Sequence, residues 1–100
     1  MKESEILQQI RLAASKMGAL VWRNNTGMLR NERGHPVFYG LCKGSSDLIG
    51  MFKGRFLALE VKMPGKKPTP EQQLFIDTVN KHGGIGAVIT DPAQLEGILK

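Results

Sequence analysis

Two short apolar segments that each carry charged residues place the strongest constraint on how this chain folds. Residues 44–50 contain Asp47 among small and apolar neighbours. Residues 57–62 contain Glu60 and, two positions later, Lys62. Successive side chains of a strand point to opposite faces, so Glu60 and Lys62 share one face. If the two segments pair as neighbouring strands, Asp47 joins this group, which would bind a hard divalent cation and place the lysine beside an activated water.

The same residues also have a nonfunctional interpretation. Glu60 and Lys62 would form a surface ion pair on a solvated strand face, and Asp47 would be a turn or edge residue. The apolar residues that flank both segments favour central, buried strands instead. A buried strand rarely carries unpaired charge without a function. We therefore expect the two segments to form a functional site.

The rest of the chain alternates between helical and strand patterns. Apolar residues at helical spacing predict a helix over residues 3–17. Thr69 as N-cap, Pro70 at the first helical position and Gln72 in a capping box predict a second helix, which His82 ends. We further expect strands or extended segments at residues 21–22, 36–39, 47–52, 55–62 and 86–90, a loop at 24–34, and a final helix over 91–100. This order is typical of an α/β fold in which residues 47–52 and 55–62 form an antiparallel hairpin.

The positive charge of the chain is concentrated around the two segments. Fourteen Lys and Arg residues and nine Asp and Glu residues give a formal net charge of +5. Residues 23–67 hold nine of the basic residues and three acidic ones, and two of these three are Asp47 and Glu60. A phosphate backbone needs such a cationic surface. Small soluble domains with other partners are also often basic, so charge alone does not decide the partner.

Several protein classes are disfavoured by what the sequence lacks. Its apolar runs are far shorter than the roughly 20 residues of a membrane span, and its first residues do not resemble a secretory signal. Cys42 is the only cysteine, so an internal disulfide is excluded, and no His or Cys stands at zinc spacing from it. Ser45 and Ser46 have no nucleophile-elbow setting. We expect one domain over residues 1–100, in a reducing cytoplasm and without membrane contact.

The order of these residues resembles the core motif of the PD-(D/E)xK nucleases. Asp47 is followed by Glu60-Val61-Lys62 and then by a helix that opens with Gln72. Together with Arg23-Asn24-Asn25, this pattern is similar to the VRR-NUC branch of that superfamily, in its small standalone form. The resemblance runs along nearly the whole chain. One departure is Ser46, which stands where the motif has a proline.

The resemblance implies a restriction-endonuclease-like αβββαβ core, in a single domain, with a central mixed sheet flanked by helices. It also implies that Mg²⁺ or Mn²⁺ is held by Asp47, Glu60 and the backbone carbonyl of Val61. Lys62 would orient or help deprotonate the attacking water, or stabilise charge on the phosphate. These residues would carry the hydrolysis of a phosphodiester bond.

The resemblance implies two further catalytic candidates, which lie on the helices. Gln72 is expected to face the active site, with Gln73 as the neighbouring alternative about 100° around the helix. Gln72 could equally serve only as the cap of its helix. Glu3 lies on the apolar stripe of the first helix and is expected to complete the site, with Glu5 as its alternative.

The resemblance also implies DNA as the partner. Arg23 and Asn25, with Asn24 between them, would contact the DNA backbone, although an ordinary polar turn explains them as well. Lys66 and Lys67 would contact phosphates, or they would only solvate their loop. Related small resolvase-like nucleases predict a homodimer that cuts branched DNA such as four-way junctions, encoded by a phage and acting inside a bacterial host. The alternatives are a nicking, flap or nonspecific nuclease, and a noncatalytic DNA-binding module.

Overall fold

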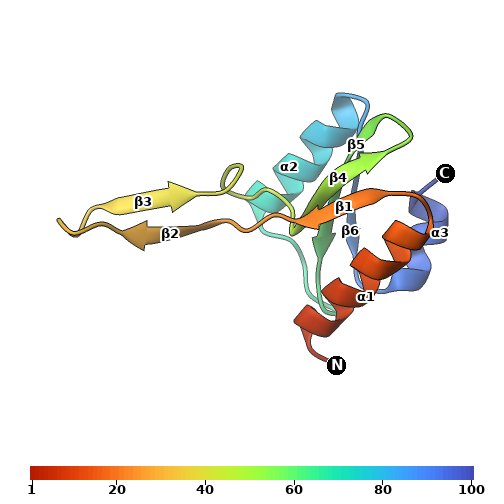
Figure 1. The fold of residues 1–100 in the computed structure, drawn as a ribbon, viewed down its shortest axis with the longest axis horizontal. Helices are drawn as coiled ribbons and strands as arrows, with labels where there is room; N and C mark the ends of the chain where they lie inside the picture. Colours follow the sequence, from red (N-terminus) through yellow and green to blue (C-terminus); the bar gives the residue numbers. More distant parts are fainter.

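The protein combines a four-stranded mixed sheet, helices on both faces of that sheet, and a two-stranded arm that projects from it (Figure 1). The computed structural model describes residues 1–100. The elements in chain order are α1 (Glu3–Lys16), β1 (Leu20–Arg23), β2 (Gly27–Arg30), β3 (Pro36–Tyr39), β4 (Leu48–Phe52), β5 (Arg55–Val61), α2 (Pro70–Lys81), β6 (Ile85–Ile89), the 3-10 turn η1 (Pro92–Gln94) and α3 (Leu95–Ile98). No helix has the length and the apolar character that crossing a membrane requires.

The main sheet has the strand order β1-β4-β5-β6. β4 pairs antiparallel with β1 on one side and with β5 on the other, and β6 lies parallel to β5 because α2 connects these two strands. The elements α1, β1, β4, β5, α2 and β6 reproduce the predicted αβββαβ core. The antiparallel hairpin expected from residues 47–62 is confirmed by the pairing of β4 with β5.

The two faces of the sheet pack against different helices. Leu57, Leu59 and Val61 alternate along β5 and are buried in the larger apolar cluster, which includes Ile6 and Ile10 of α1. Burying each of these large side chains contributes about 1.5–3 kcal/mol to folding. The opposite face carries a smaller cluster formed by Ala58 of β5 with Ile76 and Val79 of α2. Glu60 is the next residue after Ala58 on this second face, so its carboxyl group lies on the α2 side of the sheet.

The start of α2 is fixed by its predicted cap. The Thr69 hydroxyl oxygen accepts a hydrogen bond from the N–H of Gln72 at 3.2 Å, and Gln72 Oε1 accepts one from the N–H of Thr69 at 2.8 Å. Pro70 occupies the first helical position, as expected. Such a cap is worth about 1 kcal/mol, and here it also orients the side chain of Gln72.

The loop predicted for residues 24–34 is wrong. Residues 27–30 form β2, which pairs antiparallel with β3 and makes the projecting arm. The tip of the arm is closed by Asn31, whose Oδ1 accepts hydrogen bonds from the N–H groups of Arg33 and His35 at 2.9 and 3.0 Å. The short strand Gly27–Arg30 has no alternating pattern, since nearly all of its side chains are exposed. Its strand conformation depends on pairing with a segment further along the chain.

Smaller differences concern helix ends. The first helix ends at Lys16 rather than at residue 17, and the expected final helix is a 3-10 turn followed by four helical residues that end at Ile98. Asp91 caps the 3-10 turn by accepting a hydrogen bond from the N–H of Ala93 at 2.8 Å. These differences leave the position of the charged residues unchanged.

Candidate active site

The register of the sheet brings Asn24, Asp47 and Glu60 into one row. Arg23 of β1 pairs with Leu48 of β4, and Leu48 pairs with Leu59 of β5. One position further, Asn24 lies opposite Asp47, and the N–H of Asn24 donates to the Asp47 carbonyl at 2.8 Å. The same step places Asp47 opposite Glu60. Side chains of directly opposed residues lie on the same face, so the two carboxylates meet on the α2 side of the sheet.

Asp47 is held at the point where the pairing of β4 with β5 ends. Its Oδ2 accepts a hydrogen bond from the backbone N–H of Val61 at 2.9 Å. This contact satisfies an amide that has no strand partner at that position, and it fixes the direction of the carboxylate. The side chain of Asp47 is half-buried and borders solvent.

Glu60 is almost completely buried, with 2% of its surface exposed. Its Oε1 has no hydrogen-bond partner. Burial raises the pKa of Glu60 to about 9, helped by a hydrogen bond with Asp47 and by the negative charge of Asp47, while the charge of Lys62 lowers it. Two carboxylates in contact in a buried place need a shared proton or a cation between them. The unpartnered Oε1 is therefore an acceptor that a proton or a cation could satisfy.

The site contains no third acidic, His or Cys side chain close enough to complete a metal cluster with these two. Mg²⁺ is commonly bound by one or two carboxylates together with waters and substrate phosphate, so the pair is a sufficient donor set. Val61 ends β5 directly after Glu60, and its N–H contacts Asp47. The metal-ligand role of its carbonyl stays a prediction.

Lys62 follows the last residue of β5 and keeps the direction of the strand. Its N–H donates to the carbonyl of Ile89 at 3.0 Å, so the side chain stays on the same face as Glu60. Lys62 forms no ion pair, because the single salt bridge of the chain joins Lys43 to Glu71 at 3.7 Å. Lys62 is partly exposed, and its charge acts on Glu60 only through space. It remains available to a substrate.

The two candidate glutamines of α2 differ in exposure and in hydrogen bonding. Gln73 is exposed, and its Nε2 donates to Asp77 Oδ1 at 2.9 Å along the outside of the helix. Gln72 is half-buried, and its Oε1 is occupied by the cap at Thr69. The amide nitrogen of Gln72 is thus the group that remains for a substrate or water. The cap therefore leaves the amide nitrogen of this side chain without a partner, and the catalytic role of Gln72 remains a prediction.

Glu3 is exposed at the first residue of α1, and its charge is close enough to contribute to the raised pKa of Glu60. Glu5 lies in the same helical turn and is also exposed. The catalytic role of either residue remains a prediction.

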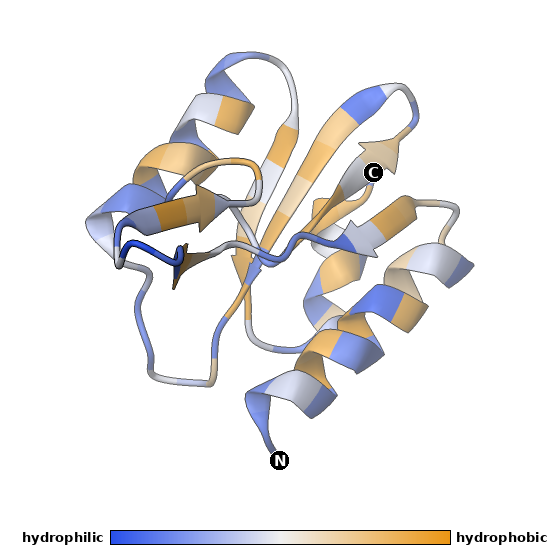
Figure 2. Cartoon of the chain, turned by 60° about the vertical axis from the view of Figure 1, so that its left-hand side comes forward, coloured by the Kyte–Doolittle hydropathy of each residue, from blue (hydrophilic) through white to orange (hydrophobic).

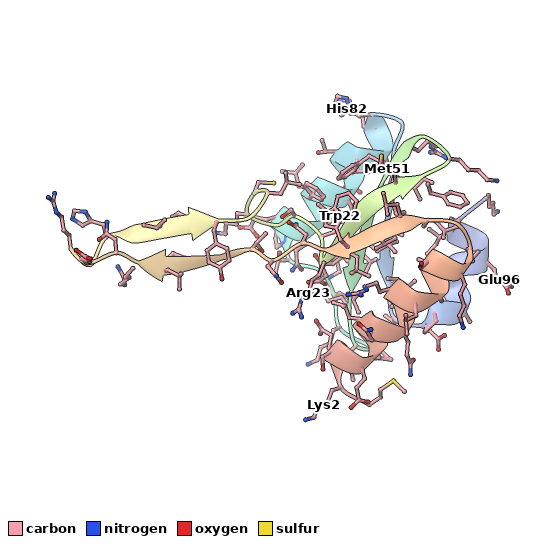
Figure 3. The ribbon with its side chains drawn as sticks, in the orientation of Figure 1. Lys2, Trp22, Arg23, Met51, His82 and Glu96 are labelled. Atoms are coloured by element: carbon pink, nitrogen blue, oxygen red, sulfur yellow. The ribbon has the colours of Figure 1, made fainter.

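A polar hollow of about 450 Å³ opens next to Asp47. It is lined by Arg23 at the end of β1, by the following residues Asn24, Asn25 and Thr26, and by Tyr39 at the root of the arm. Arg23 lies where β1 meets the arm (Figure 3). Lys66 and Lys67 are exposed in the loop between β5 and α2.

Asn24 has a structural role that the sequence pattern does not reveal. Its Nδ2 donates to Ser45 Oγ at 2.8 Å and to the carbonyl of Ser46 at 3.0 Å. Ser45 Oγ in turn donates to the carbonyl of Cys42 at 2.7 Å. These bonds anchor the turn that presents Asp47. The only sequence signal is the Arg-x-Asn stretch itself, which predicts DNA contacts and not this anchoring role.

The family model of the VRR-NUC domain matches residues 2–90 of this chain. The chain belongs to the VRR-NUC domain family. This confirms the resemblance and makes the protein a nuclease of the restriction-endonuclease-like fold.

A solved structure described as a VRR_NUC domain has the same fold, with a TM-score of 0.63 and 22% sequence identity over 95% of this chain and 90% of that one. No curated protein matches the chain. Nucleases of the VRR-NUC superfamily generally use divalent metal ions, which agrees with a buried carboxylate pair as the chemical centre.

Proposed function

We propose that this VRR-NUC domain is a metal-dependent DNA endonuclease with Asp47, Glu60 and Lys62 at its centre. The observation that carries the proposal is the contact between Asp47 and Glu60, in which a buried carboxylate oxygen has no hydrogen-bond partner. A purely structural carboxylate pair would be expected to have its buried oxygens satisfied. The membership of the chain in a nuclease family supports the same conclusion.

The donor set fits Mg²⁺ or Mn²⁺. The available side-chain ligands are carboxylate oxygens, which hard cations prefer, and softer ligands such as Cys42 are exposed elsewhere. Asp47 and Glu60 would hold the ion, together with the carbonyl of Val61. When bound, such an ion polarises a phosphate oxygen and makes a water more acidic.

The side chains of the chain itself supply positioning and charge. Lys62 Nζ would donate a hydrogen bond to the attacking water or to a phosphate oxygen, where negative charge develops. The Gln72 amide nitrogen would orient the same water, and Glu3 would lie at the open edge of the site. The bond from Val61 keeps Asp47 turned toward Glu60 throughout.

DNA would reach the carboxylates across the polar hollow. Arg23 and Asn25 border it, and Lys66 and Lys67 lie on the exposed loop that follows Lys62. Cationic and amide side chains of this kind contact phosphates without reading sequence. A homodimer acting on branched DNA, such as a four-way junction, follows from the resemblance to small standalone nucleases, since two sites related by symmetry would serve two strands.

The second candidate function is a noncatalytic DNA-binding module. The buried Asp47–Glu60 contact argues against it, because burying two carboxylates costs stability and DNA binding needs no such pair. Nicking, flap cleavage and nonspecific duplex cleavage use the same chemistry, so only the substrate distinguishes them from junction cutting.

The experiment compares cleavage of a labelled four-way junction, a flap, a linear duplex and a supercoiled plasmid in Mg²⁺, Mn²⁺ or EDTA. Glu60→Gln removes the charge of the buried carboxylate, and Glu96→Gln makes the same change on the exposed surface of α3 as the control. We expect metal-dependent cleavage that Glu60→Gln loses and Glu96→Gln keeps. Cleavage that survives in EDTA or in Glu60→Gln would overturn the proposal, and DNA binding without cleavage would favour the noncatalytic module.

A further inference from the structure

The arm formed by β2 and β3 has no packing partner within its own chain. Its strands pair only with each other, and the arm extends away from the main sheet (Figure 1). A two-stranded hairpin of this length is marginally stable in water unless a further surface covers it. We therefore expect a further surface to cover the arm and stabilise its two strands.

The arm exposes large apolar side chains, and its ribbon carries hydrophobic residues (Figure 2). Because successive side chains of a strand point to opposite faces, neighbours such as Met28 and Leu29 expose apolar groups on both faces. Phe38 is 73% exposed and Leu29 is 65% exposed. The other exposed large apolar residues of the arm and its root are Met28, Val37, Tyr39 and Leu41. A concentration of this kind on a monomer is typical of a protein–protein interface.

An apolar groove continues from the root of the arm to α2. A first hollow of about 370 Å³ lies between Met28, Phe38 and Leu41. Leu41 also lines a second hollow of about 370 Å³ against Phe75 of α2, and Phe75 shares a third hollow of about 230 Å³ with Leu74. Because these hollows share residues, they lie side by side along α2, and we call them together the α2 groove.

Charge indicates which partner this surface takes. No charged residue occurs in segments 24–29 and 36–42, which form most of the arm and its root. A DNA backbone would be expected to meet cations along its contact, whereas a second basic chain is best met by an uncharged surface. The charged residues that line the groove, Lys43 and Glu71, pair with each other at 3.7 Å, so the groove also presents little net charge to the uncharged arm.

We propose that the arm of one chain packs into the α2 groove of a second copy, and that the arm of the second copy packs into the α2 groove of the first. The groove begins at the root of the arm, so a two-fold pair uses the same surface on both chains. The strands of the arm span about 13 Å and α2 spans about 18 Å, so an arm fits along the helix. This inference rests on the homodimer in the proposed function and names the surface that forms it.

The test is sedimentation of the whole chain without DNA and in EDTA. Leu29→Glu changes the arm, and Leu74→Glu changes the groove at a residue of matched exposure, 67% against 65%. Leu12→Glu on α1, at 51% exposure on the opposite face of the sheet, is the control. We expect the wild type and Leu12→Glu to sediment as dimers. Leu29→Glu and Leu74→Glu should each weaken dimerisation by at least about 100-fold, because each homodimer would bury two carboxylates in apolar contacts.

Mixing the two variants separates arm-in-groove packing from arm-to-arm packing. A pair made of one Leu29→Glu chain and one Leu74→Glu chain keeps one intact contact, between the unchanged arm and the unchanged groove. We expect the mixture to form dimers that neither variant forms alone. As a control, thermal unfolding of each variant, followed by circular dichroism, tests whether the body of the protein stays folded.

Three results would overturn the proposal. They are a monomeric wild type, dimers that persist in both variants, and a mixture that stays monomeric. If Leu29→Glu instead weakens DNA binding without changing the mass, DNA is the occupant of the arm. Since the measurement uses neither DNA nor metal, an inactive but dimeric wild type would contradict the proposed nuclease function and leave the interface in place.

Discussion

The Asp47 carboxylate accepts a hydrogen bond from the backbone N–H of Val61 at 2.9 Å, and this contact ties the start of β4 to the end of β5. Val61 stands between Glu60 and Lys62, so one bond fixes the position of Asp47 relative to both. This contact brings charged residues that are separated in the sequence together in one site. Substitutions at each of these positions can separate metal binding, catalysis and DNA binding.

Asp47→Asn should reduce the cleavage rate by roughly 10²–10³-fold while keeping the fold. Asparagine retains an oxygen that accepts the bond from Val61 but lacks the charge that a cation requires. The measurement is the single-turnover cleavage rate, beside the circular dichroism spectrum. Asp77→Asn on the exposed side of α2 is the matched control, and equal rates in the two variants would remove Asp47 from the mechanism.

Lys62→Ala should abolish most of the cleavage activity but keep metal affinity, because the ammonium makes no ion pair with Glu60 and is assigned to the water or phosphate. Isothermal titration with Mn²⁺ and cleavage assays measure the two properties separately. Lys53→Ala, in the exposed turn between β4 and β5, serves as the control. Normal turnover in Lys62→Ala would contradict the assignment.

Asn24→Ala should act through Asp47 and not through DNA. The change removes both bonds from Nδ2 to the turn at Ser45 and Ser46, so we expect Mn²⁺ affinity to fall by about 10–100-fold. High Mn²⁺ should restore much of the activity. Asn25→Ala, one position later and exposed, should instead weaken DNA binding and leave metal affinity unchanged. The same response in both variants would contradict this separation.

Stability without metal should fall as the pH rises, because of Glu60. Its pKa in the folded protein is about 9, against an ordinary value of 4.5, so the folded state holds a proton that the unfolded state has released between these values. The unfolding free energy therefore decreases with increasing pH across this range, by up to a few kcal/mol.

Thermal unfolding in EDTA at several pH values between about 5 and 9 measures this effect. Glu60→Gln has no proton to release and should flatten the curve, so the difference between wild type and variant should grow with pH. Parallel curves for the two proteins would show that Glu60 does not carry a raised pKa. Adding Mn²⁺ should stabilise the wild type more at high pH, where the carboxylate pair is charged.

Replacing both Lys66 and Lys67 by alanine should weaken DNA binding and reduce the slope of log K against log salt by about 2, which is about 1 for each lysine that neutralises a phosphate. The measurement is fluorescence anisotropy of labelled DNA over a range of salt concentrations, in EDTA to prevent cleavage. The control is the double variant Lys2→Ala with Lys100→Ala, which removes the same amount of charge near the chain ends. An unchanged slope in the Lys66 and Lys67 variant would show that the loop does not bind phosphates.

Local sequence patterns determined the core of the fold. The apolar stripe of α1, the alternation along β5 and the cap at Thr69 each act over a few residues, and each predicted its element correctly. The spacing of Asp47 and Glu60 predicted that the two residues meet across neighbouring strands, and the pairing of β4 with β5 places them opposite each other. The family resemblance ordered these elements into the αβββαβ core that the sheet confirms.

Tertiary structure decided what depends on partners distant in the chain. β2 forms because residues 36–39 pair with it, and its exposed side chains leave no periodic signal in the sequence. Asn24 acts on Ser45 and Ser46, more than twenty positions away, so its role was invisible beside its polar neighbours. The charge pattern is local and can be recognised in sequence, whereas the burial of Glu60 and the exposure of the arm arise only when the strands pair and the helices cover them.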